Sequence, residues 1–214
     1  MKIIPNGIIL GTTMKGSPSK SDRTKSFIIE RTASVFNKKG FAGTSLSDLT
    51  EATGLTKGAL YGNFENKEDI ALAVFDFNTA SLRNSLHARA SVHENSIDKL
   101  MTIPQFCREN FHILAAQGGC PVVNTASEAD DTQPLLKRKV NHTISRWKKN
   151  LELTILQGIR RKEIKSKTDP SRYASLFIAL FEGGILLSKS TGDISFLNHC
   201  ADRMEEIIKR ELKA

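Results

Sequence analysis

The chain has 214 residues, enough for one large domain or two small ones with a buried core. Its 31 Lys and Arg residues outnumber its 23 Asp and Glu residues, and the formal net charge of +8 favours an acidic partner, either nucleic acid or an anionic membrane surface.

Cysteine spacing and hydropathy argue against several further classes of protein. The three cysteines, Cys107, Cys120 and Cys200, form no CxxC pair, which argues against a disulfide framework or a zinc site and fits a reducing cytoplasm. The longest apolar stretch, residues 176–187, contains Glu182 and is shorter than the roughly 20 residues that span a bilayer. No membrane helix is therefore expected.

Residues 1–18 follow neither a helical nor a strand pattern. Pro5 and Gly7 interrupt their short apolar run, which is too fragmented for the core of a signal peptide, and we expect a disordered leader. Met14 directly precedes a segment rich in Lys and Ser. Met14 is therefore the expected native start, and Met1 is the alternative.

A helix and a second, shorter helix are predicted next. Apolar residues between positions 19 and 39 recur at intervals of three and four, which is the helical period, and Gly40 stands where helices commonly end. Thr44 and Ser45 then offer capping hydroxyls, with Asp48 near the third helical position.

A glycine turn and two more helices follow. Gly54 breaks the second helix, and Thr56 can cap a third helix that carries Leu60 and Phe64. Asn66 begins a fourth helix, whose apolar residues run toward position 81.

Beyond about residue 84 the pattern changes to longer amphipathic helices. We expect them at 96–117, 134–162, 170–189 and 193–213, separated by breaks at 118–121 and 130–134. No strand-like alternation of useful length is present. The predicted fold is all-α.

The arrangement of helix, tight turn and helix between Thr44 and Phe64 meets the needs of a helix-turn-helix. Such a unit places the first residues of its second helix against the major groove of DNA. Thr56, Lys57 and Gly58 open that helix, where backbone N–H groups and a lysine charge suit phosphate. We therefore predict a DNA-binding domain at 19–81 and a second helical domain at 82–214.

The same segment resembles the TetR/AcrR family of transcriptional regulators over about fifty residues. The ordered run consists of Phe36, Gly40, Phe41, Thr44, Ser45, Leu46, Leu49, Gly54, Leu55, Thr56, Lys57, Gly58, Leu60, Tyr61, Phe64, Lys67 and Glu68. The resemblance implies a repressor that binds a palindromic operator as a homodimer and is released by a small-molecule inducer. It also implies three helices in the DNA-binding domain and a C-terminal domain for ligand binding and dimerisation.

The resemblance assigns DNA contacts residue by residue. The expected set comprises Thr44, Ser45, Thr56, Lys57, Gly58, Tyr61, Asn63 and Lys67. Ala59, Gly62 and Asn63 differ from the residues common in relatives, so the operator sequence is open. For Tyr61 the alternative is a core aromatic, and for Lys57 and Lys67 it is a solvated charge.

The last two predicted helices, at about 170–189 and 193–213, are the expected dimer surface. Each carries an apolar stripe, and Gly183-Gly184 would allow close approach of a partner helix. The stripe of the final helix consists of Leu197, Cys200, Ala201, Met204, Ile207, Ile208 and Leu212. The alternative is that these stripes pack inside one chain.

A ligand pocket is expected among the central helices. Its predicted lining is Phe106, Phe111, His112, Cys120, Asn124 and Trp147. Cys120 is interpreted either as a thiol that senses reactive compounds or as an inert buried cysteine.

No cofactor, metal site or catalytic set is expected. Ser17-x-x-Lys20 has the spacing of a Ser/Lys nucleophile motif but lacks the companion motifs of such enzymes. The sequence therefore contains no recognisable catalytic set, which argues against an enzyme. The remaining alternative to an inducible repressor is a TetR-like DNA-binding adaptor or architectural protein without an inducer.

Overall fold

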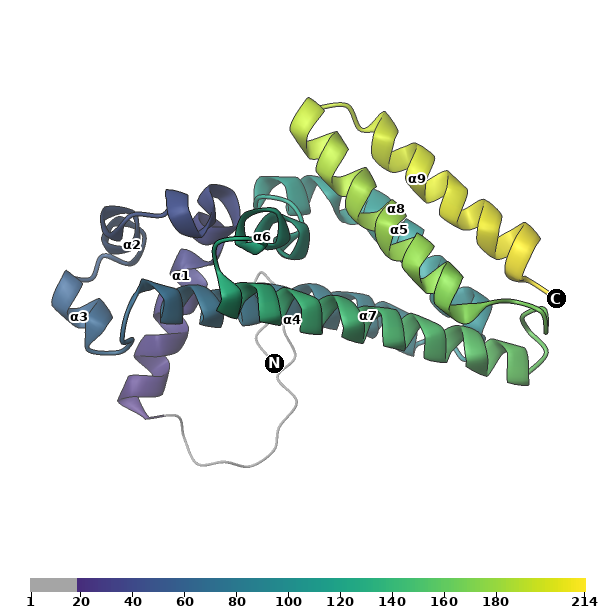
Figure 1. Cartoon of the computed structure of the whole chain (residues 1–214), viewed down its shortest axis with the longest axis horizontal. Helices are drawn as coiled ribbons and strands as arrows, with labels where there is room; N and C mark the ends of the chain where they lie inside the picture. The colour runs from purple at the N-terminus through teal and green to yellow at the C-terminus, as the bar shows by residue number, and fades with distance from the viewer. Residues whose placement is uncertain (1–18) are drawn as a thin grey trace.

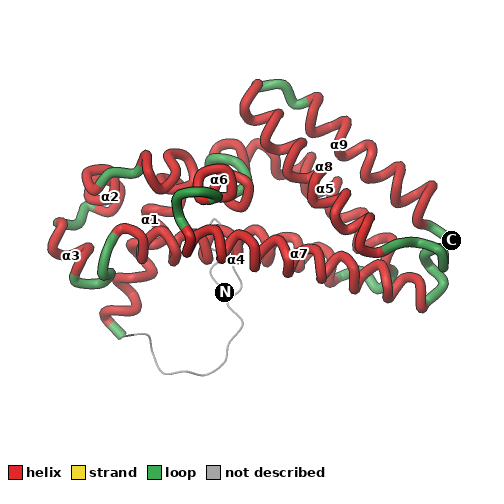
Figure 2. Tube along the Cα trace, viewed as in Figure 1, coloured by secondary structure: helices red, strands yellow, loops and turns green. Residues whose placement is uncertain are grey.

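The computed structural model describes residues 19–214; the expected leader, with Met14 and Ser17, lies outside the described residues. Between residues 19 and 214 the regular structure is helical, as predicted (Figures 1 and 2). The elements are α1 (Lys20–Gly43), α2 (Leu46–Thr53), α3 (Lys57–Tyr61), α4 (Lys67–Ser91), α5 (Ser96–Ala116), α6 (Pro121–Ala129), α7 (Pro134–Arg160), α8 (Pro170–Thr191), α9 (Ser195–Glu206) and a terminal π-helical segment (Ile207–Leu212).

Side-chain caps fix where the first helices begin. Ser45 and Asp48 form a reciprocal capping box at the start of α2, and the hydroxyl of Thr56 accepts a hydrogen bond from the Ala59 N–H at the start of α3. Asn66 caps α4 in the same way. Each such cap contributes about 1 kcal/mol to helix stability, and the predicted starts of these helices are confirmed.

Gly40, the predicted end of the first helix, instead interrupts α1. Its φ of 72° and ψ of −179° are not helical, and one further turn follows before α1 ends at Gly43. Few residues other than glycine adopt this backbone conformation. The chain therefore bends at Gly40, between the long part of α1 and the turn that leads into α2.

Two hydrophobic cores organise the molecule. The smaller core holds α1, α2, α3 and α4 together through buried residues that include Ile28, Leu49, Leu60 and Ile70. The larger one joins α4 to α9, with the first half of α4 in the small core and later residues such as Leu82 in the large one. The helix α4 runs without a break past residue 81, so the two expected domains share one helix (Figure 1).

The helix α6 was not predicted. The sequence showed a glycine-rich break and then an acidic one, and the nine residues between them are too few for a helical period to be recognised. Gly118 and Gly119 both have positive φ and turn the chain, and Pro121 occupies the first turn of α6. This short helix packs against α1 and α7.

The apolar stripe of the final helix lies inside the chain. Leu197, Ala201, Met204, Ile207 and Leu212 are fully buried in the larger core, mainly against α8 and α5. For this stripe the intramolecular alternative is correct. The exposed apolar residues of this region lie instead on α8 and just before or at the start of α9, where Leu186, Leu187, Ile194 and Phe196 are exposed.

By length and composition alone, α8 is the one helix among residues 19–214 that could cross a membrane. Core helices of soluble proteins meet the same criterion, and Phe177, Phe181 and Ile185 of α8 are buried in the larger core.

Candidate nucleic-acid interface and ligand cavity

The turn between α2 and α3 holds the short third helix against its neighbours. Gly54 adopts the left-handed conformation, with φ 68°, and its N–H donates to the carbonyl of Thr50 at 2.8 Å. Leu49 and Leu60 are completely buried beneath the turn. The backbone and the small core therefore fix the position of α3 before any partner binds.

The first residues of α3 are exposed. Thr56, Lys57 and Gly58 are all exposed, and the Thr56 hydroxyl caps the helix by accepting from the Ala59 N–H at 3.2 Å. Tyr61 is half-buried, and the half-buried Asn63 donates its side-chain amide to the Ala59 carbonyl at 2.9 Å. The lysine ammonium and the first N–H groups of α3 thus face solvent together.

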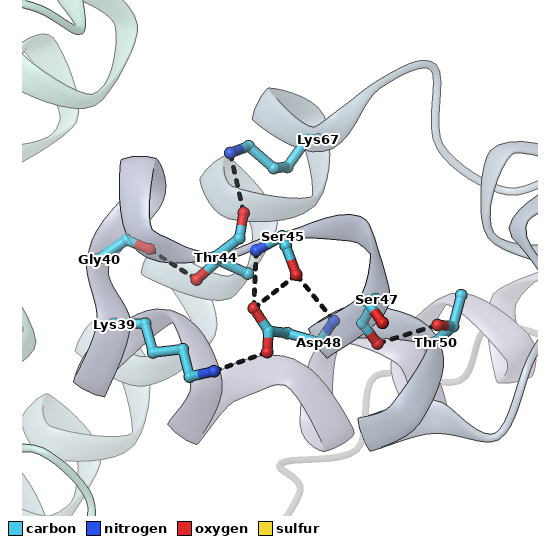
Figure 3. Close-up of polar contacts among 8 residues, drawn as sticks. All are labelled: Lys39, Gly40, Thr44, Ser45, Ser47, Asp48, Thr50 and Lys67. Atoms are coloured by element: carbon cyan, nitrogen blue, oxygen red, sulfur yellow. Dashed lines mark hydrogen bonds and ion pairs between the residues drawn. The ribbon is translucent and has the colours of Figure 1, made fainter.

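The other three predicted contacts lie at the turn between α1 and α2: Thr44 and Ser45 belong to the turn, and Lys67 of α4 reaches it (Figure 3). Thr44 is completely buried and its hydroxyl donates to the Gly40 carbonyl at 2.6 Å, so it presents no surface to a partner in this structure. The Lys67 ammonium donates to the carbonyls of Phe41 and Thr44 at 2.8 and 3.0 Å and lies 4.2 Å from the Phe41 ring centroid. Lys67 therefore ties α4 to this turn.

Ser45 is the exposed member of this group. Its hydroxyl donates to Asp48 at 2.8 Å, and Asp48 also pairs with Lys39 at 2.6 Å. The hydrogen bond from Lys39, followed by those from Ser45, lowers the pKa of Asp48 to about 2. The capping carboxylate is consequently charged across the physiological pH range and holds Ser45 in place.

A polar contact joins α6 to the bend in α1. The Glu128 carboxylate accepts hydrogen bonds from the backbone N–H groups of Phe41 at 2.7 Å and Ala42 at 2.6 Å, directly after Gly40. Asn124, predicted to line a pocket, instead donates to Asn37 and to the Gly118 carbonyl. The C-terminal helices therefore reach the DNA-binding head through α6 as well as through α4.

A cavity of about 620 Å³ lies among α4, α5, α7 and α8. It is lined by Arg83, Asn84, Leu86, His87, Ala90, Ser91, Lys99, Leu100, Thr102, Ile103, Trp147, Asn150, Leu151, Leu153, Thr154, Phe177, Ile178 and Phe181. Trp147 and Phe181 meet edge to face, with ring centroids 6.2 Å apart. An apolar wall with a few polar groups is the usual composition of a small-molecule site.

Only Trp147 of the six predicted pocket residues lines this cavity. Phe106 and Cys120 are buried in the larger core, Phe111 packs against it, and His112 is exposed. The sequence interpretation missed the second half of α4 because it ended the DNA-binding unit near residue 81. The polar and apolar residues alternating with helical period between Arg83 and Ser91 were the available signal.

Cys120 makes a buried contact with a carboxyl group. Its Sγ donates to Glu182 Oε1 at 3.1 Å, and burial, followed by the nearby Glu182, raises the pKa of the thiol well above its usual value. Burial also raises the pKa of Glu182 to about 7. Because the thiolate is the reactive form, this environment favours an inert Cys120 over an electrophile sensor.

A thiol titration tests that interpretation. Burial raises the pKa of all three thiols, that of Cys107 to about 12 and that of Cys120 well above its usual value, but Cys200 is only half-buried. We expect one rapidly reacting thiol with a chromogenic disulfide in the native protein and three in denaturant. Cys200→Ser should abolish the rapid phase, and Cys120→Ser should leave it intact; loss of that phase in Cys120→Ser would instead indicate a reactive sensor.

Comparisons with known proteins agree with this geometry. Residues 28–74 match the model for bacterial regulatory proteins of the tetR family, and residues 96–204 match the tetracyclin repressor-like C-terminal domain. A TetR-family regulator from Cytophaga hutchinsonii superposes with a TM-score of 0.88 at 43% identity, covering 92% of this chain and 98% of that one. A TetR transcriptional regulator from Chloroflexus aurantiacus superposes with a TM-score of 0.86 at 33% identity, and the match covers 91% of this chain and 98% of that one.

Curated relatives are more distant. The regulator TtgR of Pseudomonas putida is 26% identical over 79% of this chain and 82% of its own length, and the repressor DhaR of a Mycobacterium species is 23% identical over 76% and 80%.

An exposed α3 on a glycine turn, followed by a long helical domain, defines a helix-turn-helix DNA-binding transcriptional regulator rather than an enzyme. The chain belongs to the TetR family.

Proposed function

We propose that this protein is a homodimeric cytoplasmic repressor that binds a palindromic operator through α3 and is released by a small molecule bound among α4, α5, α7 and α8. The single observation that carries the proposal is the course of α4. This helix begins beside the DNA-binding head at Lys67, which is bonded to the turn before α2, and its second half lines the 620 Å³ cavity up to Ser91.

The predicted DNA-contact residues fall into an exposed group and a group that is buried or already hydrogen-bonded within the chain. Thr56, Lys57 and Gly58 at the start of α3, together with Ser45, are exposed and are assigned to DNA phosphates and base edges. Tyr61 and Asn63 border that surface. Thr44 and Lys67 are committed to the turn before α2 and are assigned to positioning it.

The dimer surface is assigned to the outward face of α8. Leu176, Leu180 and Leu187 lie at helical spacing with Ala179 and Gly183, and a Cβ at Gly183 would meet no atom within 4 Å. Leu186 and Leu187 are exposed, and so is Phe196 on α9. Pairing of two such faces about a two-fold axis would cover these apolar residues and give the symmetry that a palindromic operator requires.

Ligand and DNA would be coupled through two contacts with the head. The small molecule must favour a state in which the two α3 helices no longer match the spacing of the DNA grooves. Binding of the small molecule then weakens binding of DNA, and binding of DNA weakens binding of the small molecule. Displacement of α4 is one route, and the Glu128 contact with the Phe41 and Ala42 N–H groups is a second. The cavity favours this mechanism over an adaptor, for which a filled core is expected.

Binding to DNA from directly upstream of the gene, compared with a scrambled duplex over a salt series, tests the proposal. Specific binding by a dimer, weakening steeply as salt rises, is the expected result. Equal, weak binding to both duplexes would count against an operator at that position, and a genome-wide search for bound sites would then decide whether the protein is a site-specific repressor.

Lys57→Ala is expected to weaken binding by about tenfold and to reduce the slope of log affinity against log salt by about one, because it removes one phosphate contact. The matched control is Lys149→Ala, an exposed lysine on α7. Equal effects of the two substitutions would show that only net charge matters and that α3 is not the binding surface.

A further inference from the structure

A second hollow, of about 530 Å³, lies between α4 and α7 on the other side of Arg83 from the apolar cavity. We call it the α4–α7 groove. Its ionisable lining residues are Asp76 and Arg83 from α4, and Arg138, Lys139, His142 and Arg146 from α7. The groove therefore gathers four cationic side chains and a histidine around one carboxylate.

That carboxylate is already paired. Asp76 forms an ion pair with Lys139, which leaves Arg83, Arg138 and Arg146 without an acidic residue in the lining of the groove. Among residues 19–214, the guanidinium of Arg83 donates hydrogen bonds only to the side-chain oxygen of its neighbour Asn84, at 3.3 and 3.4 Å. Like charges gathered in one concave site repel each other unless an anion neutralises them.

Arg146 carries the more specific signal. Its Nε is buried and has no hydrogen-bond partner among residues 19–214. A solvated basic face would leave this N–H in contact with water, whereas a buried N–H without an acceptor is costly and uncommon in folded proteins. An acceptor from outside the chain would satisfy this donor.

The spacing along α7 aligns these groups. Arg138, His142 and Arg146 follow one another at intervals of four, so they lie on one face of the helix, opposite Arg83 on α4. Guanidinium groups bind phosphate oxygens through paired N–H donors. The volume falls in the usual range of small-molecule sites, and Leu72 and Leu135 add an apolar border.

We propose that the α4–α7 groove binds a phosphorylated small molecule, held by Arg83, Arg138 and Arg146. The groove is separate from the proposed inducer cavity, although Arg83 borders both, and its ligand binding does not depend on the proposed function. Occupation would join α4 to α7 at the level where α4 leaves the DNA-binding head.

Calorimetric titration of the full chain with inorganic pyrophosphate, at constant ionic strength, tests the site. We expect saturable binding by the wild type and at least a tenfold loss of affinity in Arg138→Gln/Arg146→Gln. The matched control is Arg160→Gln, an exposed arginine on α7 outside the groove, which should bind as the wild type does. Circular dichroism checks folding, and the exposed Arg138→Gln alone serves if the double variant unfolds.

The outcomes separate the ligand classes. Citrate supplies a multivalent carboxylate of similar charge, and weaker binding of citrate than of pyrophosphate supports the phosphate assignment. Equal or tighter citrate binding overturns that assignment. Absence of pyrophosphate binding by the wild type, or an equal loss in the Arg160→Gln control, overturns the site itself.

Discussion

Gly40→Ala is expected to lower the free energy of unfolding by about 3 to 5 kcal/mol, the largest effect of any substitution considered. At φ 72° and ψ −179° an alanine adopts a strained backbone that is otherwise almost confined to glycine. Its Cβ would also clash with Glu128 Oε2 and would lie 2.9 Å from Glu128 Cδ. Glu128 must then move away from the N–H groups of Phe41 and Ala42, and charge-assisted hydrogen bonds of this kind contribute about 1.5 to 3 kcal/mol.

Urea denaturation of matched variants measures this effect. Gly43→Ala is the control, because a Cβ there makes only an ordinary contact, at 3.6 Å from the Lys39 Cβ, and it should change stability by less than about 1 kcal/mol. In a Glu128→Ala background the cost of Gly40→Ala should fall, since the clash is removed and the backbone strain remains. A Gly40→Ala protein as stable as the wild type would contradict the described bend.

The same substitution bears on the proposed coupling. The bend at Gly40 presents two N–H groups to a carboxylate on α6, so the position of α6 and the position of the turn before α2 depend on each other. Thr44 and Lys67 bond to the same turn. A disturbance at Gly40 should therefore weaken operator binding even though no atom of Gly40 is assigned to DNA.

Local chemistry made the DNA-binding head predictable from the sequence. Ser45 with Asp48, and Thr56, act within three residues along the chain, and their capping roles follow from that spacing. Gly40 and Gly54 likewise indicate positions where the backbone adopts a positive φ. Such features need no knowledge of distant contacts.

The cavity and the buried groups depend on long-range packing and could not be predicted in the same way. Trp147 reaches the cavity, whereas Cys120 and Phe106 lie in the core. These positions depend on which faces of α5 and α7 meet α8 and on how the turn before α6 packs. An apolar stripe such as that of α9 also looks alike in sequence whether it packs inside the chain or against a second copy. Lys67 shows the same limit, since its carbonyl partners come from a turn 23 and 26 residues earlier.

Glu182→Gln is expected to change how stability depends on pH. Glu182 Oε1 accepts from Cys120, while Oε2 is buried without a hydrogen-bond partner, although the residue as a whole is only half-buried. Burial raises the pKa of this carboxyl from 4.5 to about 7 in the folded protein. Between these values the folded state holds a proton that the unfolded state has released, so stability falls as pH rises.

The contribution of Glu182 is therefore fully present below about pH 4.5 and is lost as pH rises through about 7. Glutamine carries no titrating proton, so the stability of Glu182→Gln relative to the wild type should increase by up to about 3 kcal/mol over that interval. Denaturant unfolding at pH 4.5, 6 and 7.5 measures the difference. Glu152→Gln, at a half-buried position on α7, is the control for removal of a carboxyl elsewhere in the fold.

A stability difference that stays constant with pH would place the Glu182 carboxyl in water rather than beside Cys120. Cys120→Ala provides a second check, because the hydrogen bond from the thiol lowers the pKa of Glu182 while burial raises it. Removal of the thiol should move the pH-dependent loss of stability to higher pH. A shift in the opposite direction would mean that the cavity left by the thiol admits water to the carboxyl, and that the raised pKa of Glu182 depends on the packing of Cys120 against it.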